Sequence, residues 1–154
     1  GDVVVELELR KPLARVMYED GTGFYLDREF NKVDLSSSYS ANRLLLRGLE
    51  REPLEPRDTV KSEQLIGMHD FLNYVDRSEL LRSQISEIVV RPNGDLVMYP
   101  EMGDVVIEFG KPDDIEKKFA NMETFYHRVL NYSGWNKYRK ISLKYKNQVV
   151  ATRN

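Results

Sequence analysis

Two tight-turn signals constrain the fold of this chain most, because each joins two strands that must run antiparallel. The first is Glu19-Asp20-Gly21 and the second is Asn93-Gly94. Asp-Gly and Asn-Gly readily adopt the positive φ that short hairpin loops need. The flanking apolar segments are 14–18, 23–26, 85–90 and 95–99, and further short strands are predicted at 42–48 and 105–109. The sequence therefore predicts a mainly antiparallel sheet.

Two other segments have the hydrophobic period of helices. In the first, Thr59 or Ser62 can cap a helix whose apolar residues are Leu65, Met68, Leu72 and Val75. The second is predicted over residues 113–132 and follows Pro112. Its apolar stripe is Ile115, Phe119, Met122, Tyr126 and Val129, with Lys117, Lys118 and Glu123 expected outside. The expected fold class is α+β, a mainly antiparallel twisted sheet with two packed helices.

The first residues alternate in polarity, with Val3, Val5, Leu7 and Leu9 on one face of a predicted strand. No neighbouring segment is an evident partner for this face, so we expect an orphan strand from a sheet that is otherwise missing. Because the chain starts at Gly1 and runs directly into this strand, we also expect an excised fragment.

Composition excludes several classes of function. With 154 residues, 41% of them hydrophobic, the chain is long enough for one domain with a core. The formal charge of -2 gives no general attraction to nucleic acid or anionic lipid, so any basic site must be local. There is no cysteine, which excludes disulfides, thiolate chemistry and cysteine-based zinc sites.

Residues suited to catalysis do not combine into a known arrangement. His69 and His127 lack metal-binding spacing, and the serines at 36–38 lack the frame of a nucleophile elbow. Glu101 and Asp104 are separated by a turn sequence in which acids are ordinary. We therefore predict no enzymatic activity, no metal and no cofactor.

The last segment predicts a strand at the edge of the sheet. Ile141, Leu143 and Tyr145 would share one face, while the other face would carry Lys140, Ser142, Lys144 and Lys146. An edge strand is either protected by charge or covered by another chain, and the lysines suit both purposes. Aromatic residues gather nearby at Tyr132, Trp135 and Tyr138. Such a group is typical of interface hot spots and of single-stranded nucleic acid platforms, but Trp135 and Tyr138 could equally seal the junction between helix and strand.

The order of motifs resembles the FtsQ/DivIB family of bacterial cell-division proteins over essentially the whole chain. The motifs are Arg10-Lys-Pro-Leu-Ala-Arg15, Gly23-Phe-Tyr-Leu-Asp27, the stretch 36–40, Val106-Ile-Glu-Phe-Gly110 and Ile141-Ser-Leu-Lys-Tyr145. Gly134-Trp-Asn136 and Lys144-Tyr-Lys-Asn-Gln-Val149 are most similar to its Bacteroidetes branch. One departure is Glu29-Phe30, where family members usually have a glycine, so that turn is expected to differ locally.

The resemblance implies a non-catalytic divisome scaffold at the periplasmic face of the inner membrane, at the division septum. It implies that residues 1–13 are the last strand of a truncated POTRA domain and that residues 14–154 form the β domain, with a membrane anchor upstream. The implied partners are FtsB-like and FtsL-like proteins, bound by strand addition at the C-terminal edge. The implied contact residues are Tyr145, the main anchor, with Lys144, Asn147, Val149 and Trp135.

Two rival functions remain open on the sequence alone. A periplasmic domain rich in tyrosine could be a glycan-binding module or cell-wall enzyme, although no catalytic carboxylate geometry is evident. The basic C-terminal residues could bind nucleic acid, although the net charge of -2 weighs against this function.

Overall fold

The computed structural model describes residues 1–3, 12–33, 44–52, 59–130, 137–145 and 147–154. The strands are β1 (Ala14–Met17), β2 (Gly23–Leu26), β3 (Lys32–Val33), β4 (Leu45–Arg47), β5 (Ile85–Val90), β6 (Leu96–Pro100), β7 (Val106–Gly110), β8 (Tyr138–Ser142) and β9 (Val150–Arg153). The helices are α1 (Glu63–Ile66), α2 (His69–Arg77), α3 (Glu79–Gln84), α4 (Ile115–Phe125) and a π-helical turn, η1 (Tyr126–Leu130).

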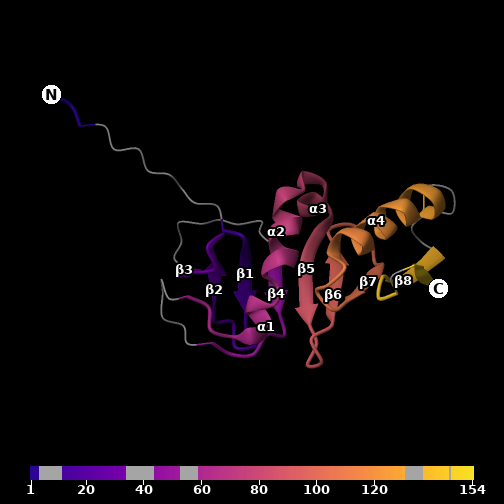
Figure 1. Cartoon of the computed structure of the whole chain (residues 1–154), viewed down its shortest axis with the longest axis horizontal. Helices are drawn as coiled ribbons and strands as arrows, with labels where there is room; N and C mark the ends of the chain where they lie inside the picture. The colour runs from indigo at the N-terminus through magenta and orange to yellow at the C-terminus, as the bar shows by residue number, and fades with distance from the viewer. Residues whose placement is uncertain (4–11, 34–43, 53–58, 131–136, 146) are drawn as a thin grey trace.

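The described strands form one sheet in the order β3-β2-β1-β4-β5-β6-β7-β8-β9. Five neighbouring pairs are antiparallel, and three, β1 with β4, β4 with β5 and β7 with β8, are parallel. Figure 1 shows the helices crossing over this sheet, with α2 and α3 near its middle and α4 towards β8. The predicted α+β class with a mainly antiparallel sheet is confirmed.

Both predicted hairpins are present. β1 pairs with β2 and β5 pairs with β6, each antiparallel. Gly21 and Gly94 have φ values of 84° and 89°, the left-handed conformation that an L-amino acid with a side chain rarely adopts. In the first turn, Asp20 Oδ1 also accepts a hydrogen bond of 3.0 Å from the Thr22 amide. Local turn chemistry therefore set these two strand pairs.

The first predicted helix is instead three short helices. Ser62 caps α1 by accepting a hydrogen bond from Leu65 N, and Gly67 is the C-cap that follows its last residue. Ser78 caps α3 in the same way, through Leu81 N. Ser78 has extended φ and ψ, so the helical hydrogen bonding restarts there. All four residues of the predicted stripe are buried, namely Leu65, Met68, Leu72 and Val75. The hydrophobic period of the sequence predicted which face is buried, but it did not predict where one helix ends and the next begins.

Aromatic packing holds α2 and α4 on the sheet. The ring centroids of Phe71 in α2 and Phe109 in β7 are 4.9 Å apart, and that of Phe119 in α4 lies 5.0 Å from Phe109. Phe119 and Met122 are buried as predicted, while Ile115, Tyr126 and Val129 are partly buried against the core. The predicted helix 113–132 is α4 followed by η1, and residues 131–132 lie outside the described part.

The prediction that Lys118 lies on the outside of the helix is wrong, because its side chain is buried. Its Nζ donates hydrogen bonds to Lys111 O at 2.9 Å and to Asp113 Oδ1 at 2.8 Å. It also lies 4.8 Å from the centroid of the Phe109 ring. The loop before α4 folds back over the helix start and supplies both acceptors, so the ammonium group is buried with partners.

A second buried charge, Glu52, lies in the segment between β4 and α1. Glu52 is buried, and its Oε2 lies 3.3 Å from Nζ of the buried Lys32 in β3. Its Oε1 accepts hydrogen bonds from the amides of Lys61 and Ser62, just before α1. The pair thus joins β3 to the start of the helical region.

Two N-terminal predictions have different outcomes. Val3 is exposed, whereas Val5, Leu7 and Leu9 lie outside the described residues, so the orphan strand stays a prediction. The turn at Glu29-Phe30 places Phe30 at a φ of 59°, the conformation that glycine favours. Its buried ring lies 4.8 Å from the His69 ring, a contact that glycine could not make.

We predict that Phe119→Ala lowers the free energy of unfolding by about 3 to 5 kcal/mol, because it empties the centre of the aromatic cluster. Chemical denaturation measures this loss. Thr124→Ala, at an exposed position of the same helix, should change stability by no more than about 0.5 kcal/mol. Equal stability of the two variants would show that the α4 stripe does not form the core.

Candidate functional site

The C-terminal edge of the sheet is the candidate site, and it is formed by β9. The sequence predicted that the strand carrying Ile141 and Leu143 lies at the edge of the sheet. The structure corrects this, because β8 is paired on both sides, parallel to β7 and antiparallel to β9. Ile141, Ser142 and Leu143 are buried. Among the described strands, β9 has β8 as its one neighbour.

The direction of the β9 amides follows from one hydrogen bond. Asn154 N donates to Lys137 O at 3.0 Å, so this amide points inward to the chain segment entering β8. Amides along a strand alternate in direction. The N–H groups of Ala151 and Arg153 therefore point to the outer edge, and that of Thr152 points to β8. Sequence reasoning missed these two positions, because side-chain identity carries no signal for the direction of an amide.

Tyr145 lies in the turn between β8 and β9, beyond the end of β8. Its side chain is 52% exposed, and its carbonyl oxygen accepts a hydrogen bond of 3.4 Å from Gln148 N. β8 ends at Ser142, and Tyr145 is not buried as Ile141 and Leu143 are. Its ring therefore belongs to the exposed turn that leads into β9.

The other predicted contact residues have different surroundings. Asn147 is exposed, and Val149 is partly buried against the core. Trp135 lies outside the described residues. Tyr138 is buried, with its ring centroid 5.6 Å from that of Phe125, so this tyrosine belongs to the core. The described structure thus places Tyr145, Asn147 and Val149 in one turn before β9.

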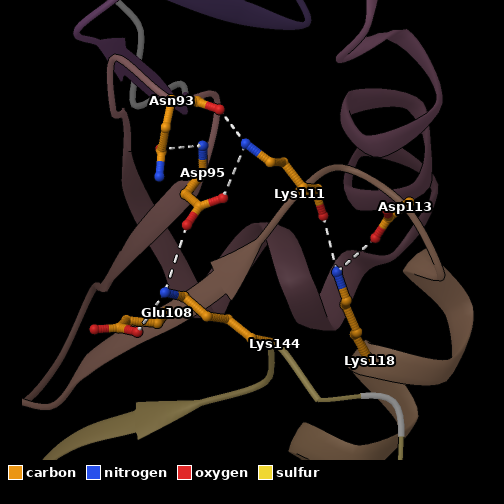
Figure 2. Close-up of polar contacts among 7 residues, drawn as sticks. All are labelled: Asn93, Asp95, Glu108, Lys111, Asp113, Lys118 and Lys144. Atoms are coloured by element: carbon orange, nitrogen blue, oxygen red, sulfur yellow. Dashed lines mark hydrogen bonds and ion pairs between the residues drawn. The ribbon is translucent and has the colours of Figure 1, made fainter.

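The side chain of Lys144 extends along the sheet and forms ion pairs with two acids, Asp95 and Glu108 (Figure 2). Its Nζ lies 3.4 Å from Asp95 Oδ2 and 3.4 Å from Glu108 Oε2. Lys140 Nζ lies 3.1 Å from Glu108 Oε1, and Lys111 Nζ lies 3.3 Å from Asp95 Oδ1. We call these five residues the lysine–acid cluster. It ties β8 and the turn after it to the turn before β6, to β7 and to the loop that follows β7.

The lysines lower the pKa values of Asp95 and Glu108, although burial of the two carboxyl groups acts in the opposite direction. Burial alone would raise the pKa of Asp95, but the hydrogen bonds and charges of Lys111 and Lys144 lower it overall. Burial would also raise the pKa of Glu108, which Lys140 and Lys144 lower. The charge of Glu108 raises the pKa of Lys144 in turn. Asp95, Glu108 and Lys144 are therefore charged at neutral pH.

This arrangement revises the interpretation of the C-terminal lysines as edge charges. Lys140 and Lys144 form ion pairs with Glu108 in β7, two strands from the edge. A partner contact through Lys144 would have to compete with these pairs, so its contact role stays a prediction. The signal available in the sequence was Glu108 itself, an acid within the apolar strand 105–109.

The residues considered for catalysis lie apart. His69 is exposed, with Nδ1 3.3 Å from Asp70 Oδ1, and His127 Nε2 lies 3.9 Å from Glu123 Oε1. Glu101 and Asp104 are exposed in the turn between β6 and β7, and the serines at 36–38 lie outside the described residues. In the described part of the chain no group of three or more His, Asp or Glu residues is arranged to hold a metal.

None of the helices described is long and apolar enough to cross a membrane.

Comparison with known proteins places the chain in one family. The model of the family described as FtsQ/DivIB, C-terminal related, matches residues 11–152. No match was found among curated proteins. The match covers every strand and helix described above up to Thr152, including the turn that carries Tyr145.

We predict that Lys144→Met lowers the free energy of unfolding at neutral pH by about 1 kcal/mol, because it removes the ion pairs with Asp95 and Glu108. The loss is small because water screens these partly exposed pairs. The ordinary pKa values of Asp95 and Glu108 are 3.8 and 4.5, and both are lowered in the folded chain. Their contribution is therefore present above these values and is lost as the pH falls through the folded pKa values.

Denaturation at a series of pH values measures this effect. The stability difference between Lys144→Met and the parent chain should shrink as the pH falls from about 5 to about 2. Lys117→Met is the control, because Lys117 is exposed on α4 and forms no ion pair with a described residue. A difference that stays constant with pH would show that Lys144 acts through packing alone.

Proposed function

Because this chain belongs to the FtsQ/DivIB, C-terminal related family of cell-division proteins, we propose that it is a non-catalytic scaffold of the divisome. In this proposal it works at the periplasmic face of the inner membrane and binds FtsB-like and FtsL-like partners. Strand addition to β9 carries the binding. The observation that supports it is the position of β9, a strand with a neighbour on one side among the described strands.

The edge is suited to pairing with an extended segment. The outward amides of Ala151 and Arg153 donate to the carbonyl groups of the added strand, which supplies affinity independent of sequence. Val150 is 43% exposed, so an apolar side chain of the partner can pack on it. A short edge flanked by charge is also how proteins avoid uncontrolled pairing, and Arg153 and Lys137 provide such charge here.

Tyr145 supplies specificity in this proposal. Its ring is half exposed in the turn that precedes β9, and tyrosine is a frequent interface hot spot. The lysine–acid cluster fixes the start of that turn through Lys144, so the ring is held near the edge before the partner arrives. Such preorganisation reduces the entropy lost on binding.

We predict that Ala151→Pro weakens binding of an FtsB-like periplasmic peptide about tenfold or more, because proline removes an outward N–H and obstructs the added strand. Stability should change little, since that amide makes no bond to β8. Isothermal titration and a thermal melt measure the two effects. Thr152→Pro is the matched contrast: it removes an inward amide and should lower stability instead. Unchanged affinity for Ala151→Pro with the fold intact would exclude strand addition at β9.

We predict that Tyr145→Ala weakens the same complex by roughly 2 kcal/mol or more, as loss of a hot-spot ring does. The change in stability should be small, because the ring is half exposed. Tyr99→Ala serves as the control, because Tyr99 is also exposed but lies on β6. A loss of stability as large as the loss of affinity would show that Tyr145 supports the fold rather than the partner.

A further inference from the structure

A groove lies between α3 and α4, and none of its described lining comes from β9. It consists of two hollows. One, of about 400 Å³, lies between Leu81 of α3 and Phe119 of α4. The other, of about 470 Å³, lies against Pro100 and the turn between β6 and β7. Gln84 and Tyr126 line both hollows, so the two form one depression, which we call the α3–α4 groove.

The groove has apolar side chains exposed at its rim. Met102 is 82% exposed and Leu80 is 50% exposed, and each lines one of the hollows. Large apolar side chains exposed together at a depression are typical of interaction sites. Each hollow has the volume that proteins use for binding, about 300 to 1,000 Å³. The groove can therefore accept apolar side chains of a partner.

The lining carries several acids. Its described residues include Glu101, Glu116 and Glu123, with His127 Nε2 3.9 Å from Glu123 Oε1, but no lysine or arginine. Glu101 and Glu116 form no ion pair with a residue in the described ranges. A partner with lysine or arginine beside its apolar residues would thus find acceptors on both hollows, whereas an acidic partner would be repelled.

The π-helical turn η1 shapes the centre of the groove. The turn begins directly after α4 and places Tyr126 between the two hollows. Burial raises the pKa of Tyr126 to about 12, so its hydroxyl stays protonated at any physiological pH. Single π-helical turns within α-helices are frequent at functional sites.

We propose that the α3–α4 groove binds a basic amphipathic helix of a partner protein. Its apolar residues, spaced one helical turn apart, occupy the two hollows, and its lysines or arginines pair with Glu101, Glu116 and Glu123. Two flanking helices with an apolar floor are the arrangement that receives a helix in a groove. This site is separate from strand addition at β9, so the domain can hold two partner segments at once.

A methionine-methyl NMR titration tests the proposal with the whole chain. The probe is a helical peptide of about 18 residues, with leucine on one face and lysine on the other. The chain has five methionines, of which Met102 and Met122 line the groove. We expect their methyl signals to shift, while those of Met17, Met68 and Met98 stay in place. A matched peptide with glutamate in place of lysine should bind at least about tenfold more weakly.

Variants assign the binding to the groove. Glu101→Lys with Glu116→Lys should weaken binding of the basic peptide about tenfold, whereas Glu19→Lys, an exposed glutamate in the β1–β2 turn, should leave it unchanged. Glu116 lies in the first turn of α4, where negative charge stabilises a helix, so a thermal melt accompanies this variant. Met102→Glu is the second test, because Met102 is exposed in a turn and its replacement leaves the core intact.

Several outcomes would overturn the proposal. They are equal binding of both peptides, no binding at millimolar peptide, shifts at Met17 instead of Met102, or unchanged affinity in Met102→Glu. Self-association of the chain that Met102→Glu abolishes would assign the groove to a second copy and not to a basic helix. None of these results bears on Ala151→Pro, so failure here and failure of strand addition at β9 are distinguishable.

Discussion

The packing of Phe119 against Phe109 and Phe71 is the contact on which the C-terminal half of the sheet depends. β8 runs parallel to β7, so no hairpin can join them, and the chain must cross over the sheet through α4. That crossover returns to the sheet only if α4 is fixed above β7. The aromatic cluster fixes it, and Lys118 closes the loop at its start. The edge strand β9 exists because β8 is in place to receive it.

Electrostatics then determines where the last turn lies. Asp95 and Glu108 are mostly buried at their side chains, and each is compensated by two lysines from different segments. Each pair is individually modest, since half-exposed ion pairs contribute little. Together they fix the positions of four segments relative to one another, because all the ion pairs form only when these segments lie close together. Lys144 is thereby held away from the edge, and the turn leaves Tyr145 facing outward.

The two proposed surfaces use different physical means. β9 offers backbone groups, which bind any extended segment and need a side chain such as Tyr145 for selectivity. The α3–α4 groove offers apolar volume with acids around it, which selects a helix by its pattern of leucine and lysine. A scaffold with two such surfaces can bring one strand and one helix together, from one partner or from two. Neither surface needs a catalytic group.

The sequence alone determined what depends on neighbouring residues. Asp20-Gly21 and Asn93-Gly94 fixed two hairpins through local φ preferences, and the apolar periods identified Phe119, Met122 and Leu72 as core. Only the tertiary structure decided what depends on distant partners. Lys118 is buried because a loop folds back over it, β8 is interior because α4 is a crossover, and Lys144 is paired because Asp95 and Glu108 face it. The direction of the β9 amides was likewise set by register, since a backbone N–H has the same chemistry whichever way it points.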